Sequence, residues 1–236
     1  ILGTTDTPRS EAEAEPKALD EEIDFILETA ADYLVKPPTR ADVLSVFAGL
    51  RPLAAPKTEG AATKEVSRSH KIVVSDSDLF SILGGKWTTF RQMGEDMVDE
   101  ILKVKKMSAK GSTSAQIKLH GYPNGHTPEG HWRVYGSEAK AIQALMAEQP
   151  ELKQPLHPKY PNTKAEVVWM TRHEMAQRIE DVLARRLRTL FMDAQAALDM
   201  AAPVGEILQQ ELGRDDAWYE KEVADFKAVA RGYLLA

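Results

Sequence analysis

The residues of this chain that could take part in chemistry gather in the stretch ILGGKWTTF, at positions 82–90. Gly84 and Gly85 separate an apolar run typical of a strand from a segment that opens on two threonines, so a sharp strand-to-helix turn is expected. The first amides of a helix have no partner within it and carry partial positive charge, to which Lys86 adds a full charge. The stretch therefore predicts a site for a ligand with electron-rich oxygens.

A plain strand-to-helix turn explains the same residues without a ligand. In that interpretation the two glycines serve only the backbone geometry, and Lys86 is solvated. The stretch matches neither the GxGxxG fingerprint nor a P-loop. The pattern alone therefore leaves both interpretations open.

Two arginines upstream favour the ligand. Arg51 stands in AGLRPL at the end of an apolar run, and Arg68 stands in SRSHKI at the beginning of another. A guanidinium among buried neighbours needs an anionic partner, and a phosphate or carboxylate can meet it with two hydrogen bonds. We therefore expect these arginines to bind an anionic substrate. The alternative is a pair of internal salt bridges, to Asp6 or Asp42.

The elements that position these residues are predicted from the periodicity of the apolar side chains. The chain opens on the end of a strand over 1–5, and a helix follows over 20–36. The next predicted elements are a strand over 42–53, a hairpin with strands over 69–75 and 79–83, and a helix over 88–103. The glycines thus fall between the second hairpin strand and this last helix.

Beyond a basic and serine-rich linker the pattern is helical. Helices are predicted over 137–149, 164–176, 178–188, 193–202, 203–213 and 215–234. Pro203 suits a first helical position, Gly213 a C-terminal cap and Asp215 an N-terminal cap. The predicted fold class is therefore α+β, with a partial mixed α/β region over 1–105, a linker over 106–125 and an all-α domain over 126–236.

The composition excludes several classes of protein. The chain has 236 residues, of which 43% are apolar and 28% charged, as in a globular protein with a core. It has no cysteine, which excludes disulfides, thiolate zinc sites and cysteine nucleophiles, and no metal site is predicted. The net charge of −6 and the lack of a basic stripe predict no nucleic-acid partner. No membrane-spanning run or signal peptide is visible.

Several stretches, in one order and spacing, resemble the catalytic region of FAD-dependent glycerol-3-phosphate dehydrogenases. They are GTTD at 3–6, AGLRPL at 48–53, SRSHKI at 67–72 and SILGGKWTTFRQMGEDMVD at 81–99. The stretch TRHEMAQRIEDVLARRLRTLFMDAQAALDMA at 171–201 is similar to the C-terminal helical domain of that family. The resemblance covers most of the chain and is weakest over 104–165.

The resemblance implies a flavin oxidoreductase. In that family FAD accepts a hydride from C2 of sn-glycerol 3-phosphate, giving dihydroxyacetone phosphate, and the electrons pass to a quinone. Arg51 and Arg68 would then bind the substrate, Arg68 its phosphate, and Lys86 would also be catalytic. The residues that the resemblance places at the cofactor are Gly84, Gly85, Lys86, Trp87 and Thr88.

The resemblance further implies a cytoplasmic protein attached peripherally to the inner face of the membrane, and a homo-oligomer. Three alternatives stay open: a glycerol-phosphate oxidase that uses oxygen, another flavin oxidoreductase, or a non-catalytic helical interaction module. The sequence opens on ILGTTDTP, already inside an apolar run, and lacks the N-terminal strand–GxGxxG–helix unit of such enzymes. We therefore expect a fragment of a longer enzyme, one that binds FAD weakly or not at all and is inactive alone.

Residues outside this motif are expected to be structural. RHEMAQ has glutamine where a zincin has its second histidine, so His173 is expected to pack or to form a salt bridge. Arg185 follows Asp181 by four residues, which predicts an ion pair on a helix surface. KVKKMSAK is expected to be a solvated linker, with contact to acidic lipid as the alternative. The expected core aromatics are Trp169, Trp218, Phe226 and Tyr233.

Overall fold

The structure, a computed structural model, describes residues 1–50, 69–123, 125 and 127–235. The chain divides into two compact units. The first, here called the helical unit, comprises 1–6, 14–49 and 121–236, and the second, here called the hairpin–helix unit, comprises 7–13 and 50–120. The domain boundaries expected near 105 and 125 stay a prediction.

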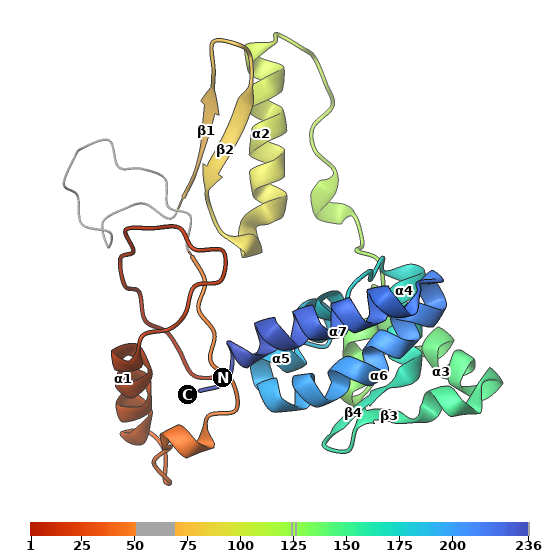
Figure 1. Cartoon of the computed structure of the whole chain (residues 1–236). Helices are drawn as coiled ribbons and strands as arrows, with labels where there is room; N and C mark the ends of the chain where they lie inside the picture. Colours follow the sequence, from red (N-terminus) through yellow and green to blue (C-terminus); the bar gives the residue numbers. More distant parts are fainter. Residues whose placement is uncertain (51–68, 124, 126, 236) are drawn as a thin grey trace. The chain divides into compact units, whose positions relative to one another are not determined.

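The helical unit consists of helices and one short hairpin (Figure 1). Its helices are α1 (Asp20–Ala31), α3 (Ala139–Glu148), α4 (Lys164–His173), α5 (Thr189–Met192), α6 (Ala194–Leu212) and α7 (Asp216–Arg231). A π-helix over Asp181–Arg186 and short 3-10 helices connect them. None of the helices in the described part of the chain is long and apolar enough to cross a membrane.

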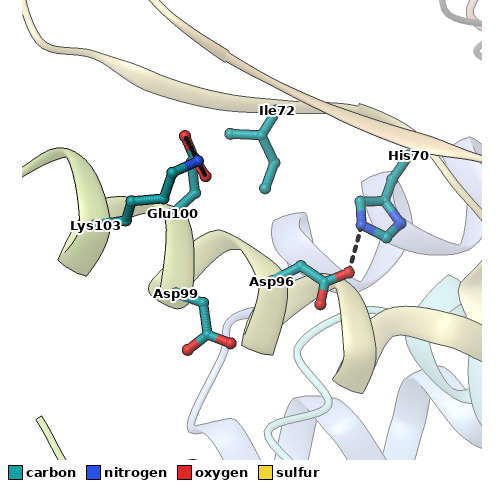
Figure 2. Close-up of a pocket in the computed structure, with 6 residues that line it drawn as sticks. All are labelled: His70, Ile72, Asp96, Asp99, Glu100 and Lys103. Carbon is teal, nitrogen blue, oxygen red and sulfur yellow. Dashed lines mark hydrogen bonds and ion pairs between the residues drawn. The ribbon is translucent and has the colours of Figure 1, made fainter.

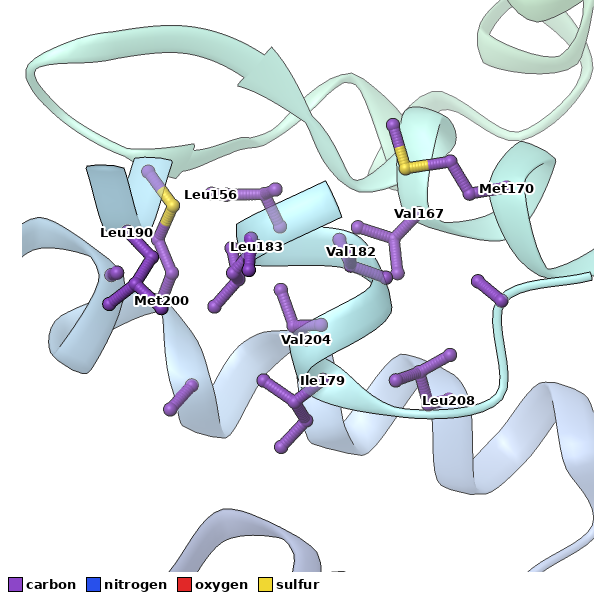
Figure 3. Close-up of a cluster of buried hydrophobic side chains, with 14 of the residues drawn as sticks. Leu156, Val167, Met170, Ile179, Val182, Leu183, Leu190, Met200, Val204 and Leu208 are labelled. Atoms are coloured by element: carbon purple, nitrogen blue, oxygen red, sulfur yellow. The ribbon is translucent and has the colours of Figure 1, made fainter. Parts of the chain in front are cut away.

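The core of the helical unit lies between α4, α6 and the segment that carries the π-helix (Figure 3). Helices α6 and α7 also pack side by side, and Gly205 allows the approach. A Cβ built on Gly205 would lie only 3.0 Å from both Tyr219 Cε2 and Val223 Cγ2. Fully buried side chains in this core include Ile142, Met170, Ile179, Leu183, Leu190, Met200 and Leu208. Apolar burial on this scale is the dominant stabilising term of the unit.

A buried polar network closes the start of α4. Glu166 is fully buried and completes the capping box with Thr163. The Tyr135 hydroxyl donates to Glu166 Oε1 at 2.8 Å, and Asn162 Nδ2 donates to the same oxygen at 3.0 Å. Burial raises the pKa of Tyr135 strongly, and the neighbouring Glu166 carboxylate raises it further. These hydrogen bonds compensate for the cost of burying the Glu166 carboxylate away from water.

The ends of α6 and α7 confirm the two predicted caps. Gly213 adopts a left-handed conformation (φ 62°) at the end of α6, and the Asp215 side chain accepts from the Trp218 amide at 2.8 Å. The prediction that Pro203 begins a separate helix is wrong, because α6 runs without interruption from Ala194 to Leu212. Proline removes one hydrogen bond from a helix interior, but residues on both sides of Pro203 are buried in the core and hold the helix together.

Two predicted strands do not form. Residues 1–5 have no strand geometry, and neither does the described part of 42–53, where Arg40–Asp42 is a 3-10 helix. The backbone after this 3-10 helix is extended. It forms hydrogen bonds with other segments of the helical unit and not with a strand. Leu44 O accepts from the Ala194 amide at 3.0 Å, and the Val46 amide donates to Tyr233 O at 2.8 Å. The Phe47 ring packs edge-on against Phe191, with centroids 4.9 Å apart.

One hairpin was not predicted. Strands β3 (Pro155–His157) and β4 (Tyr160–Thr163) pair antiparallel within the region expected to be helical throughout. The Tyr160 hydroxyl donates to Asp193 Oδ2 at 2.9 Å, which connects the hairpin to the N-cap residue of α6. The predicted packing of the core aromatics is confirmed: Phe226 is buried, and Trp169, Trp218 and Tyr233 pack against the core.

The hairpin–helix unit confirms the predicted hairpin and helix. Strands β1 (His70–Val74) and β2 (Phe80–Gly84) pair antiparallel, with Ile72 opposite Ile82. A 3-10 turn over Trp87–Thr89 then leads into α2 (Phe90–Val104), which lies along the hairpin (Figure 1). Within its described residues no side chain of this unit is fully buried. The α+β fold class expected from the sequence is confirmed.

Candidate functional site

The turn between β2 and α2 has the backbone geometry that its glycines predict. Gly84 ends β2 with φ 71°, and Gly85 follows with φ 82°. Two consecutive residues in this region of backbone space are rarely tolerated unless they are glycine, because a Cβ would meet the backbone. The chain thus leaves the strand through a tight turn whose two glycines contribute no side chain.

Gly85 is also confined by its neighbours. A Cβ built on it would lie 2.5 Å from Met93 Sδ and 3.3 Å from His70 Cβ. Met93 belongs to α2, and His70 is the first residue of β1, opposite Gly84 in the strand register. The turn is therefore packed between the strand on one side and the helix on the other.

The residues after the glycines face solvent in the described structure. Lys86 is extended (φ −135°, ψ 146°), and its carbonyl accepts from both the Thr89 amide and the Thr89 hydroxyl at 3.0 Å. Trp87 is 87% exposed and stacks on Phe90, with ring centroids 5.8 Å apart. Lys86 makes no ion pair with any described residue. An exposed cation that pairs with no described residue and a large exposed aromatic side chain thus follow the two glycines.

A histidine and an aspartate that sequence reasoning did not single out join β1 to α2. His70 Nε2 lies 2.8 Å from Asp96 Oδ2 (Figure 2). Asp96 Oδ1 accepts from Gln92 Nε2 at 2.7 Å. Both side chains are partly buried. The two residues are 26 positions apart, so no local spacing could have revealed the pair. The only signal in the sequence is that each residue lies inside one of the stretches that carry the family resemblance.

The same surface holds a shallow depression of about 520 Å³. It lies between β1 and α2, and its lining residues are His70, Ile72, Asp96, Asp99, Glu100 and Lys103 (Figure 2). Three of these side chains are carboxylates, and one of them, Glu100, holds the ammonium of Lys103 at 3.0 Å. Such a lining repels an anion, so this depression does not suit a phosphorylated substrate.

The structure thus brings together one part of the predicted site. Gly84, Gly85, Lys86, Trp87 and Thr88 form one continuous turn that opens a helix. Arg51 and Arg68 lie outside the described residues, and their substrate-binding role stays a prediction.

The residues predicted to be structural agree with their interpretation. His173 packs on Trp169, with ring centroids 3.9 Å apart. Arg185 pairs with Asp181 at 3.5 Å and with Glu180 at 2.9 Å. The structural roles predicted for His173 and Arg185 are therefore confirmed.

By its fold, this is an α+β protein in which a hairpin–helix unit with a glycine turn is joined to a helical unit with its own core. A family model described as the C-terminal domain of alpha-glycerophosphate oxidase matches residues 82–219, more than half of the chain. The chain belongs to this family. The resemblance found in the sequence is therefore confirmed.

Curated relatives that are named glycerol-3-phosphate dehydrogenase align with nearly the whole chain. Glycerol-3-phosphate dehydrogenase 2 of Mycobacterium tuberculosis is 32% identical over 258 residues, a match that covers 100% of this chain and 43% of the relative. The mitochondrial glycerol-3-phosphate dehydrogenase of Bos taurus is 33% identical over 94% of this chain and 33% of its own length. The chain thus spans less than half the length of these relatives.

A solved structure has the same fold. The glycerol-3-phosphate dehydrogenase from Bacillus halodurans, complexed with FAD, matches with a TM-score of 0.75 and 24% sequence identity. The match covers 99% of this chain and 49% of that protein. The fold described above is therefore that of about one half of a larger protein of known structure.

Proposed function

We propose that this chain is part of an FAD-dependent enzyme that oxidises sn-glycerol 3-phosphate to dihydroxyacetone phosphate. The observation that carries the proposal is the membership of the alpha-glycerophosphate oxidase family, together with relatives named glycerol-3-phosphate dehydrogenase that align over the whole chain. The glycine turn falls inside the matched residues. When bound, FAD supplies the hydride acceptor.

The turn has the features that a flavin-binding surface needs. Positive φ at Gly84 and Gly85 gives a tight turn in which the backbone itself, and no side chain of these two residues, is available to a ligand. The first amides of the helical segment, near Trp87 and Thr88, are oriented to donate toward negative charge. Lys86 stands at the same point with no ion pair among the described residues. These residues therefore fit the cofactor.

Each residue of the proposed site then has its own role. The glycines give close approach, the amides of Trp87 and Thr88 stabilise negative charge that develops on the cofactor, and Lys86 stabilises charge near the reacting carbon. Arg51 and Arg68, predicted from the sequence, bind the substrate, and Arg68 holds its phosphate. The bound phosphate fixes the orientation of the C2 carbon.

More than half of the length of the curated relatives lies outside the match with this chain. We propose that the dinucleotide-binding unit lies there, and that the present chain alone binds FAD weakly or not at all and is inactive. The electron acceptor is proposed to be a quinone, and the enzyme to be cytoplasmic, homo-oligomeric and attached peripherally at the inner face of the membrane. Oxygen is the second candidate acceptor, because the family model that matches is described for an oxidase.

The first experiment is a titration with FAD, followed by flavin fluorescence. It compares this chain with the full-length protein, and dye reduction by glycerol 3-phosphate is then measured for Lys86→Ala and Arg68→Ala in the full-length protein. We expect flavin binding only in the full-length protein and loss of dye reduction in both variants. A full-length protein that binds no flavin, or variants that reduce dye normally, would refute the proposed function.

The acceptor is tested separately, with the same preparation. Oxygen consumption without an added quinone measures the oxidase reaction, and reduction of a short-chain quinone under anaerobic conditions measures the dehydrogenase reaction. We expect the quinone reaction to be the faster of the two.

Membrane attachment is tested by sedimentation with vesicles of anionic lipid and release by high salt, which weakens contacts between exposed charges.

A further inference from the structure

Two polar side-chain contacts, here called ties, link the β1–β2 hairpin with α2 and the residue after it. They lie at opposite ends of the hairpin. At the glycine end, His70 Nε2 lies 2.8 Å from Asp96 Oδ2. At the other end, Asp78 lies in the loop between β1 and β2, and its Oδ2 is 2.5 Å from the ammonium of Lys105. The first contact joins β1 to α2, and the second joins the loop of the hairpin to Lys105, the residue that follows α2.

The first tie is continuous with the predicted flavin-binding turn. His70 is the strand partner of Gly84, and its Cβ lies 3.3 Å from the position where Gly85 would carry a side chain. A movement of His70 is therefore transmitted to the turn through direct contact. No such contact links the turn with Asp78 or Lys105, which act at the far end of the hairpin.

The helix side of the turn is held by residues within one helical turn of each other. Met93 closes over Gly85, and Asp96 follows Met93 by three residues, which places both on neighbouring positions of the α2 surface. Gln92 donates to the second oxygen of Asp96 at 2.7 Å, so both oxygens of that carboxylate are fixed. Gly85 thus has His70 on its strand side and Met93 on its helix side, and the His70–Asp96 hydrogen bond links the strand to the helix.

We propose that His70 and Asp96 are positioning residues, which fix the Gly84–Thr88 turn against the start of α2. The inference deepens the proposed function and rests on it. Neither residue has to touch the flavin, because the pair acts by holding the amides and Lys86 in one geometry. Donors stabilise developing charge only when they are already oriented, and a displacement of about 1 Å can cost about a hundredfold in rate.

The test uses the full-length protein with FAD bound and three variants. His70→Leu removes the hydrogen bond and puts an apolar side chain in place of the imidazole. His70→Gln keeps a nitrogen donor in reach of Asp96. Lys105→Gln breaks the far tie and is the matched control. Two quantities are measured: the rate of flavin reduction by glycerol 3-phosphate and the reduction potential of the bound flavin.

We expect His70→Leu to slow flavin reduction between about tenfold and about a hundredfold and to make the flavin potential more negative, because fewer oriented donors face the reduced ring. The KM for substrate should change little, since the substrate arginines are untouched. His70→Gln should restore most of both quantities. Lys105→Gln should leave both at the wild-type value.

Two results would overturn the inference and leave the proposed function intact. One is a His70→Leu protein that binds FAD and matches wild type in rate and potential. The other is a Lys105→Gln protein that is slowed as much as His70→Leu, which would mean that the hairpin needs any tie and not this one. If His70→Leu does not fold, Asp96→Asn decides by the same two measurements, because it keeps the side-chain volume. A wild-type protein without flavin would refute the proposed function and this inference together.

Discussion

The helical unit and the hairpin–helix unit place their apolar side chains differently. All the fully buried side chains of the described chain belong to the helical unit, where α4, α6 and α7 surround a common core. The hairpin–helix unit has one two-stranded sheet against one helix, so its apolar residues share a single contact face and stay partly in water. A hairpin of this kind is marginally stable by itself. The candidate site therefore lies where local turns and side-chain ties, and not a core, determine the geometry.

The comparison predicts a large difference between two identical substitutions. Leu208 in α6 is 0% exposed, whereas Leu83 in β2 is 46% exposed. Leu208→Ala should lower the free energy of unfolding of the helical unit by about 2–5 kcal/mol, because it leaves a cavity. Leu83→Ala should cost about 1 kcal/mol or less, because half of its side chain already contacts water.

Hydrogen exchange measured by mass spectrometry tests both substitutions in this chain, since peptides from each unit are followed separately. The comparison would be contradicted if Leu208→Ala and Leu83→Ala caused equal losses of protection, each in its own unit. A loss at Leu83→Ala that spread to peptides of α6 would contradict it too, because it would show that the units unfold together.

Two glycines in the hairpin–helix unit should respond in opposite directions. Gly85→Ala should lower its stability by about 1–2 kcal/mol, because a side chain at φ 82° is strained and would also meet Met93. Gly94→Ala should raise it by about 0.5–1 kcal/mol, because Gly94 lies inside α2 with nothing within 4 Å of its Cβ position. Chemical denaturation with exchange of the α2 amides measures both. A stabilising Gly85→Ala would show that the turn does not need its observed backbone.

A third prediction concerns the acid sensitivity of the helical unit. Burial by itself raises the pKa of Asp193, but the Ala196 amide, the Tyr160 hydroxyl and the Lys159 ammonium outweigh it, so the pKa lies below its usual value. A carboxylate with a lowered pKa in the folded state stabilises the protein above the unfolded-state pKa, near 4. That stability is lost as the pH falls through the lower, folded-state pKa.

Asp193→Asn should therefore lower the free energy of unfolding by about 1 kcal/mol at pH 7. It should also flatten the decline of stability below about pH 4. Urea denaturation at pH 7, 5 and 3 measures both effects. An unchanged decline of stability at acidic pH in the variant would mean that groups other than Asp193 determine the acid sensitivity.

The local features of the candidate site could be predicted from sequence, because they depend on neighbours in the chain. Gly84 and Gly85 predict the turn, and the apolar repeat from Phe90 onward predicts α2. The His70–Asp96 pair could not be predicted, because it depends on the register of β1 against β2 and on how α2 packs across them.

The errors in the fold have the same cause. An apolar, β-branched run such as 42–53 shows only that the chain is extended, and its partners, here Ala194 at the start of α6 and Tyr233 just after α7, are set by tertiary packing. The β3–β4 hairpin consists of short strands with a proline in each, a composition that argues against strands. Pro203 was placed at a helix start by local preference, which the packing of α6 overrides.

The smallest expected effect comes from an ion pair on the surface of the helical unit. Arg172 in α4 makes two hydrogen bonds to Glu211 in α6, at 2.6 and 2.7 Å, and this pairing raises the pKa of Arg172. Exposed pairs contribute little because water screens the charges, so Arg172→Gln should lower the free energy of unfolding by less than about 1 kcal/mol. Denaturation in low and high salt measures it, and the difference should shrink in salt. A loss as large as that of Leu208→Ala would mean that surface charges, and not the core, hold α4 against α6.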